Sequence, residues 1–135
     1  MKQEELHQAV ALAERLRHVF ILTVDPEGMP HLAAADNLTL APDGRVRVSG
    51  WFCPGTVNNL LAGDRISLVV WDQAADSGYQ LLGRAGKPRE VAVLDGYLPE
   101  ENASPPIPQI NREVAIRVVK ILAFSHGPHY DVEMD

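Results

Sequence analysis

The residue types most able to do chemistry gather in the middle of the chain, around its single cysteine. Cys53 is followed by Pro54 and Gly55, and Thr56 comes three positions after the thiol. A cysteine becomes a nucleophile where a nearby cation or a helix amino terminus favours the thiolate. No histidine or lysine adjoins Cys53 in the sequence. A reactive thiol is therefore one interpretation, and a small buried apolar residue is the one we favour.

Thr56 opens a short helical pattern that continues with Val57, Leu60 and Leu61 and stops at Gly63. Threonine hydroxyls cap helix amino termini. The unpaired N–H groups and positive dipole end of such a terminus also favour a phosphate. Thr56 is thus either a helix cap or a phosphate contact. The same helix contains Asn58 and Asn59. These two asparagines are either surface residues or ligand contacts.

Near the carboxyl end, His126 and His129 have an H-x-x-H spacing, and Asp131, Glu133 and Asp135 follow them. All five are residue types that bind metals. The intervening glycine and proline prevent a helix from holding both imidazoles on one face. We therefore expect no metal site. Rossmann and phosphate-loop glycine motifs, a nucleophile elbow and an HExxH helix are also absent from the sequence.

Two tryptophans and two arginines complete the candidates. Trp51 and Trp71 are interpreted as aromatic residues of the core or of a subunit interface. For Trp51, the alternative is a ring that stacks on a ligand. Arg45 and Arg47 alternate with valines, as on a half-buried strand. They either form a solvated strand face or face an anion.

Composition limits the class of protein. With 135 residues the chain is expected to form one domain, over 1–135. Its net charge of −6 argues against a nucleic-acid partner and against docking on anionic lipid. The first twenty residues are too charged for a signal peptide, and no apolar run reaches the roughly 18 residues of a membrane helix. With one cysteine and no disulfide possible within the chain, we expect a cytoplasmic protein.

The elements follow from periodicity. Residues 3–18 predict an amphipathic helix, with apolar residues at helical spacing. Strands are predicted at 19–24, 31–40 and 45–49, joined by turns at 25–28 and 41–44 that contain Pro and Gly. After the short helix come strands at 65–71, at 78–84 (running into a bend at 91–94) and at 114–124. Residues 99–108 are predicted as a loop.

The last of these strands is apolar on both faces. One face is predicted to carry Val114, Ile116, Val118, Leu122 and Phe124, and the other Val119 and Ile121. Both faces must therefore be covered, one by the barrel interior and the other by the amino-terminal helix or by a second copy of the chain. A helix remains an alternative for this stretch. The whole order predicts a mainly β, six-stranded antiparallel split barrel, with an amino-terminal helix and a short helix after the third strand.

Five segments in this order resemble the pyridoxamine 5′-phosphate oxidase-like split barrels that bind flavin mononucleotide (FMN). They are Phe20–Pro30, of the family's ATVDxDGxP type, then Val46–Trp51, Thr56–Leu60, Asp64–Val70 and Leu82–Ala85. Together they span residues 19–85, and the strand from Val114 matches the family's closing strand.

The resemblance implies a homodimer with two FMN molecules in clefts between the subunits. The phosphate would lie at the start of the short helix, and the ring along the second and third strands. The positions assigned to the cofactor are Thr39, Ser49, Gly50, Trp51, Thr56, Val57, Asn59 and Arg84. Catalytic residues are not identified by the sequence.

The chain departs from the family's pattern at two places. Where the family has basic residues around the short helix, this sequence has Pro54, Gly55 and Thr56, and on the second strand it has Ala34 and Thr39. Loss of charge-assisted bonds weakens a phosphate site, unless Arg84 or the partner chain compensates. The extended carboxyl-terminal segment that grips the vitamin in the oxidase is also missing.

Three functions therefore stay open. The first is a flavin-dependent oxidoreductase, without true pyridoxamine phosphate oxidase activity, that uses a reduced nicotinamide. The second is a non-catalytic carrier or sensor of flavin, deazaflavin or haem. The third is a structural dimer that has lost its ligand.

Overall fold

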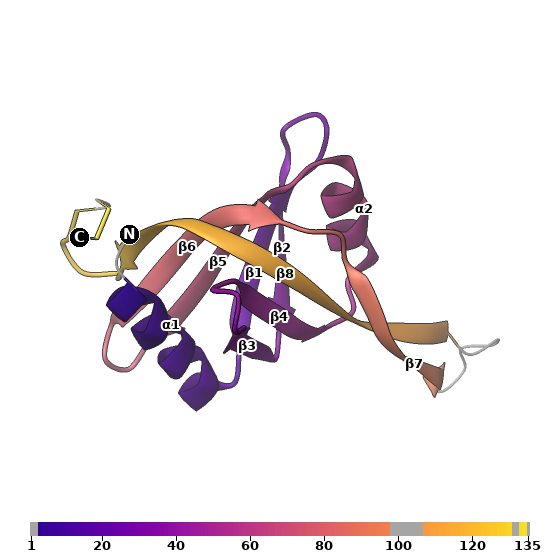
Figure 1. The fold of residues 1–135 in the computed structure, drawn as a ribbon, viewed down its shortest axis with the longest axis horizontal. Coiled ribbons are helices and arrows are strands. Elements are labelled where there is room, and N and C mark those ends of the chain that lie inside the picture. Colours follow the sequence, from indigo (N-terminus) through magenta and orange to yellow (C-terminus); the bar gives the residue numbers. More distant parts are fainter. Residues whose placement is uncertain (1–2, 98–106, 131–132, 135) are drawn as a thin grey trace.

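A single antiparallel sheet curls into an incomplete barrel, with one helix before it and one helix within its sequence (Figure 1). The computed structural model describes residues 3–97, 107–130 and 133–134. Within these residues the elements are α1 (Gln3–Leu16), β1 (Val19–Val24), β2 (Pro30–Ala35), β3 (Asn37–Leu40), β4 (Val46–Trp51), α2 (Pro54–Ala62), β5 (Arg65–Asp72), β6 (Ser77–Ala85), β7 (Arg89–Tyr97) and β8 (Ile107–Phe124). The strand order is β2-β1-β5-β6-β8-β4-β3, and β7 pairs with β8. The predicted mainly β split barrel with two helices is confirmed.

Eight strands form in the described part of the chain instead of the six predicted, and one of the two extra strands arises because a predicted strand changes partner. The stretch expected as a single strand, 31–40, is divided at Asp36 into β2, which pairs with β1, and β3, which pairs with β4. The Asp36 N–H donates to the carbonyls of Ser49 and Gly50, both at 3.2 Å. The short helix therefore follows the fourth strand, not the third. The alternation breaks at this point, since Asp36 and Asn37 are both exposed between buried Ala35 and Leu38. The prediction of one continuous strand overlooked these two adjacent polar residues.

The second half of the sheet is also longer than predicted. The bend expected at 91–94 belongs to a separate strand, β7, and β8 begins at Ile107 rather than at Val114. This early part of β8 pairs with β7, and the part that follows pairs with β4 and β6. The helical alternative for 114–124 is wrong. Of the loop predicted at 99–108, residues 99–106 lie outside the described residues and the last two begin β8.

A bulge in β8 overturns the predicted assignment of its faces. Leu82 of β6 pairs with Lys120, and Gly83 pairs with Val118, so that Val119 has no opposite residue and is 48% exposed. One extra residue reverses the alternation of a strand. The buried residue after Val118 is consequently Ile121, whereas Leu122 and Phe124, predicted to share the face of Val118, are only partly buried.

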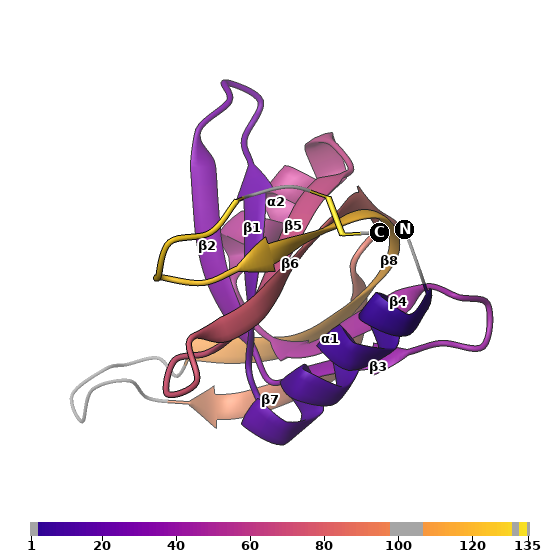
Figure 2. The same ribbon diagram turned by 90° about the vertical axis from the view of Figure 1, so that its left-hand side faces the viewer.

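The helix α1 completes the core. Leu6, Ala9 and Ala13 are buried and join the cluster of strand residues inside the barrel. The helix lies mainly against β3, β5 and β6, and Figure 2 shows it beside β3. The predicted amphipathic helix is confirmed, although it ends at Leu16, just before Arg17 with its φ of +60°.

The two predicted turns form as expected. Asp25 accepts the N–H groups of Glu27 and Met29 on its carboxylate, at 2.9 and 2.8 Å, and Gly28 has a φ of +87°. The turn after β3 closes through a bond from the N–H of Gly44 to the carbonyl of Ala41. Both geometries match the local chemistry of Asp, Pro and Gly in turns.

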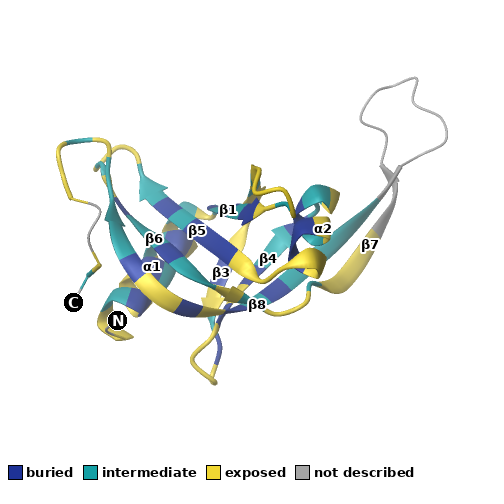
Figure 3. Cartoon of the chain, turned by 90° about the horizontal axis from the view of Figure 1, so that it is seen from above, coloured by how far each residue is buried: buried dark blue, intermediate teal, exposed yellow. Residues whose placement is uncertain are grey.

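The ribbon of β7 and the first part of β8 projects from the barrel as an arm (Figures 1 and 3). Val91 and Val93 of β7 are 52% and 53% exposed. Two strands alone are only marginally stable in water. This arm thus carries apolar surface that its own chain leaves uncovered among the described residues. No helix in the described part of the chain has the length and apolar character needed to cross a membrane.

Candidate functional site

The amino end of α2 leaves backbone donors unpaired. Cys53, not Thr56, is the residue that precedes the first helical turn, and no side chain caps it. Pro54 occupies the first helical position, where its missing N–H is harmless. No described residue accepts a hydrogen bond from the N–H of Gly55 or Thr56. Thr56 is 0% exposed, so the N–H of Gly55 is the donor that faces an outside anion, and the helix dipole adds to its attraction.

Thr56 lies inside the protein rather than at its surface. Its side chain is 0% exposed, and its hydroxyl has no hydrogen-bond partner among the described residues. A buried hydroxyl without a partner is destabilising by about 1–3 kcal/mol. Because the hydroxyl is covered, a ligand outside the chain does not reach it in this conformation. Val57 is partly buried and packs against the core.

His31 of β2 lies against the start of α2, a neighbour that the sequence did not predict. Its Nε2 is 3.6 Å from the sulfur of Cys53. A Cβ on Gly55 would lie 3.2 Å from the same nitrogen. The other ring nitrogen, Nδ1, is buried without a partner among the described residues. The packing of α2 against β2 brings together residues 22 positions apart, so proximity along the chain gave no sign of the thiol–imidazole contact.

Residues predicted to line the cofactor ring lie on different faces of the sheet. Thr39 of β3 is exposed and lies opposite Arg47, and Ser49 is half-buried near the end of β4. Gly50, with a φ of +75°, forms a bulge after Ser49, so that the next side chain points inward. Trp51 is 0% exposed and donates its Nε1–H to the carbonyl of Val48 at 3.1 Å. It is a core residue whose ring is not available for stacking.

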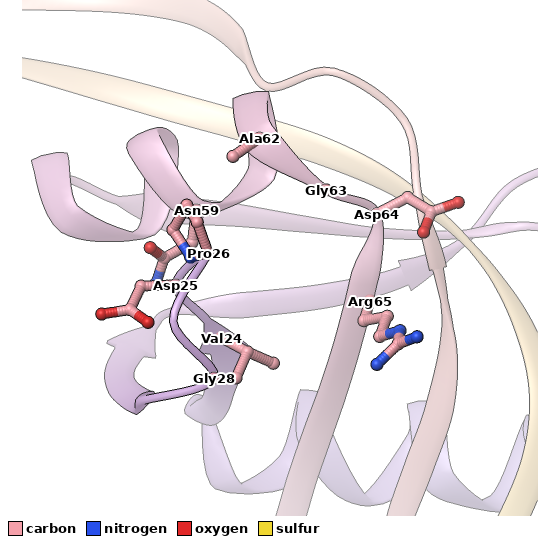
Figure 4. A pocket seen from close by; sticks show the side chains of 9 residues that line it. All are labelled: Val24, Asp25, Pro26, Gly28, Asn59, Ala62, Gly63, Asp64 and Arg65. Atoms are coloured by element: carbon pink, nitrogen blue, oxygen red, sulfur yellow. The ribbon is translucent and has the colours of Figure 1, made fainter.

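Asn59 holds α2 onto β1. Its amide donates to the hydroxyl of Thr23 at 2.9 Å, and both side chains are buried. It also borders a hollow of about 250 Å³ between α2 and the turn after β1 (Figure 4). Ligand pockets for small molecules usually occupy about 300–1,000 Å³, so this hollow is too small for a whole flavin. The residues that line it are Val24, Asp25, Pro26, Gly28, Asn59, Ala62, Gly63, Asp64 and Arg65.

Arg84 lies at the opposite end of α2 from the predicted phosphate position. It donates to Asp64 at 2.9 Å, two residues after the helix ends. Arg84 is thus far from the amino end of α2 and does not supply the missing positive charge there.

The two histidines near the carboxyl end are held in different ways, His126 by its backbone N–H and His129 by its ring Nδ1, which lies 2.8 Å from the carbonyl of Gly127. The N–H groups of His126 and Gly127 donate to the carboxylate of Asp76, at 2.6 and 2.8 Å. These bonds, first that from His126 and then that from Gly127, lower the pKa of Asp76, and a bond from Trp71 adds to them. Within the described residues no three potential metal ligands gather; Asp131 and Asp135 are outside them.

The groups that can reach an anion fit a phosphate. They are the N–H of Gly55 and the half-buried imidazole of His31, which lie together because Gly55 carries no side chain. An FMN phosphate would be held there by the helix dipole, by this N–H and by one imidazole, without arginine or lysine in that first turn.

Solved structures with the same fold include FMN-binding proteins. An FMN-binding protein from Syntrophomonas wolfei superposes with a TM-score of 0.64 and 20% identity, over 93% of this chain and 90% of that one. HupZ of Group A Streptococcus gives 0.62 and 18%, over 96% and 98%. A Clostridium acetobutylicum protein of the pyridoxinephosphate oxidase family, related to general stress protein 26, gives 0.60 and 16%, over 93% and 92%.

At these identities the likeness establishes the fold alone. No family model matches the sequence, and no curated protein matches it. The chain is therefore similar in fold to the pyridoxamine 5′-phosphate oxidase-like FMN-binding split barrels, as the sequence resemblance predicted.

Proposed function

We propose that the protein is a homodimeric, FMN-binding split barrel that acts as a flavin-dependent oxidoreductase. The observation that carries the proposal is the amino end of α2, where the backbone N–H of Gly55 has no partner in the described residues and an imidazole lies beside it. The likeness in fold to an FMN-binding protein supports the proposal, and the cofactor's phosphate would lie at this end of the helix.

The ring of the flavin would lie on the outer face of β3 and β4. Thr39 and Ser49 face outward there, next to the segment that leads into α2. Their hydroxyls can donate to or accept from the polar edge of a flavin. Trp51, Thr56 and Asn59 would act from beneath, by fixing the bulge and the helix on which the cofactor rests.

A second subunit would close the cofactor site. The hollows of one chain near α2 are smaller than a flavin needs. The exposed valines of the β7–β8 arm provide apolar surface for a partner. A dimer that covers the arm would stabilise it and bring a second surface toward β3 and β4.

The bound FMN would supply the redox chemistry, accepting a hydride from a reduced nicotinamide. The chain's own groups would bind and orient it. His31 is the side chain at the phosphate end, and its Nε2, which lies beside Gly55, would donate a hydrogen bond to the phosphate.

A second candidate is a non-catalytic carrier or sensor of flavin, deazaflavin or haem. It is favoured by the first turn of α2, which contains no charged side chain. A phosphate held only by neutral donors is bound more weakly than one held by arginine. If the affinity for the phosphate were too low for any binding, the protein would be the structural dimer that has lost its ligand.

An absorbance spectrum of the protein after incubation with FMN and gel filtration, followed by addition of NADH or NADPH, distinguishes these functions. The oxidoreductase predicts a retained flavin spectrum that bleaches with nicotinamide and recovers in air. A retained flavin that does not bleach would indicate the carrier. Colourless protein would refute flavin binding.

A further inference from the structure

Four arginines form one continuous row across the outer face of the barrel. Arg65 of β5 pairs with Arg84 of β6, and Arg84 pairs with Arg117 of β8. Arg45 immediately precedes Val46, whose partner is Ile116, so Arg45 lies beside Arg117. Directly opposed residues of neighbouring strands point to the same face. All four are exposed, while Val46, Ile66 and Ile116 beside them are buried.

The row borders two hollows. One, of about 180 Å³, is lined by Arg45, Arg84 and Arg117 together with the small residues Ala85, Gly86 and Ala115. The other, of about 300 Å³, shares Arg84 and is lined also by Arg65 and Lys120, with Ile66, Leu82, Gly83 and Val119. Arginine side chains therefore surround the first hollow, and the second combines cations with apolar residues.

The row has little compensating negative charge. Arg84 pairs with Asp64 at 2.9 Å, and Arg45 lies 4.0 Å from Asp43, both at exposed positions where an ion pair contributes little. Arg65 and Arg117 have no acidic partner among the described residues. Like charges directly opposite each other destabilise a sheet. In a chain of net charge −6, four adjacent arginines are a local excess of positive charge that an anion would relieve.

We propose that the hollow among Arg45, Arg84 and Arg117 binds the phosphate group of a small phosphorylated molecule. Guanidinium groups form paired bonds with phosphate oxygens and keep their charge at any physiological pH. A volume of about 180 Å³ accommodates a phosphate but is below the size of a usual ligand pocket. The organic part of the ligand would then extend into the neighbouring hollow, over Leu82 and Val119.

This site is separate from the amino end of α2. The nine residues of α2, at about 1.5 Å each, place its two ends roughly 13 Å apart, and Arg65 follows the carboxyl end. Along β4, Arg45 precedes the strand and Cys53 follows it, with six strand residues between them that span roughly 20 Å. One phosphate cannot bridge the two places.

Calorimetric titration of the full chain with inorganic phosphate, in a phosphate-free buffer of low ionic strength, tests the proposal. Arg117→Gln removes one cation from the hollow. It is expected to weaken phosphate binding about tenfold or more, the effect of one lost bond to a charged group. Arg89→Gln is the matched control, since Arg89 is an exposed strand arginine that pairs with Glu113 outside the row. It is expected to leave the affinity unchanged.

Melting temperatures test independently whether phosphate relieves the repulsion between the arginines. Without phosphate, Arg117→Gln is expected to melt at a slightly higher temperature than the natural chain, and added phosphate to raise the melting temperature of the natural chain more than that of the variant. If Arg117→Gln does not fold, Arg45→Gln serves instead, because Arg45 lies in an exposed turn before β4.

The same titration on FMN-loaded protein separates this proposal from the flavin site. Unchanged phosphate affinity in the presence of FMN supports a second site. Competition between FMN and phosphate, absence of phosphate binding, or equal affinities of the natural chain and Arg117→Gln would each overturn it. A chain that binds phosphate at the row but does not retain FMN would refute the proposed function alone.

Discussion

The two ends of α2 differ in the groups with which each can attract an anion. The amino end has the unpaired backbone N–H of Gly55 and a half-buried imidazole, with no charged side chain in its first turn. The carboxyl end leads into Asp64 and Arg65, at one end of a row of exposed arginines. The first end offers dipoles at fixed positions, and the second offers full charges on flexible stems. Fixed donors select shape, whereas exposed charges attract any anion and are screened by salt.

The comparison depends first on α2 being packed against the barrel. Leu60 is 1% exposed, and Leu60→Ala is expected to lower the free energy of unfolding by about 2–5 kcal/mol. Leu61, its neighbour, is 57% exposed, and Leu61→Ala is expected to change it by less than about 0.5 kcal/mol. Urea denaturation measures both. Equal losses would mean that the helix is not held by this face.

The next largest expected effect is the loss of stability on changing Gly50, in the bulge that leads into the amino end of α2. Gly50 and Gly44 both have positive φ, but a Cβ on Gly50 would lie 2.8 Å from the Cβ of Asp36, and one on Gly44 would meet nothing within 4 Å. Each alanine is expected to cost about 1–2 kcal/mol for its backbone conformation. Gly50→Ala is expected to cost at least about 1 kcal/mol more, because Asp36 must shift. Thermal unfolding of the two variants, if indistinguishable, would contradict the close approach.

Alanine substitutions of the glycines at the two ends of α2 compare the two ends directly. A Cβ on Gly55 would lie 3.2 Å from His31, whereas one on Gly63 would meet nothing within 4 Å. Gly55→Ala is expected to displace the imidazole and weaken FMN binding about tenfold, the value of one bond to a charged group. Gly63→Ala, whose φ of −160° suits any residue, is expected to leave it unchanged. Fluorescence titration with FMN provides the measurement, and equal affinities for both variants would remove His31 from the site.

The smallest effect is an acid titration away from both ends. Bonds from the N–H groups of His126 and Gly127 lower the pKa of Asp76 from its ordinary value of 3.8. Their stabilising effect is therefore complete above the unfolded pKa and is lost as the pH falls through the lower, folded pKa. The amide resonances of His126 and Gly127 are expected to move below pH 3.8, before those of Gly55 and Thr56. Movement of all four together would indicate global unfolding instead.

Local chemistry made much of this fold predictable. The turn at Asp25–Gly28 and the helix at α1 form where the types of their residues require them to form. Periodicity could not reveal which strands pair on either side of Asp36, nor the bulge at Val119, because both depend on residues far away in the chain. Pairing between distant strands is a tertiary property, so it overrides a local pattern.

The site was less predictable than the fold, for the same reason. Position in the sequence placed Thr56 at a helix start but did not show that its hydroxyl is buried. His31 and the arginine row arise from strand register, which brings together residues that are far apart in the chain. Alternation of Arg45 with valine did predict an outward-facing arginine, but not its neighbours.

Light scattering coupled to gel filtration, with absorbance detection of flavin, shows on the FMN-loaded protein whether two chains together bind FMN at the amino end of α2. We expect a mass of twice 14.8 kDa with one FMN per chain, and less flavin retained by Gly55→Ala than by Gly63→Ala. A single-chain mass without flavin would contradict it.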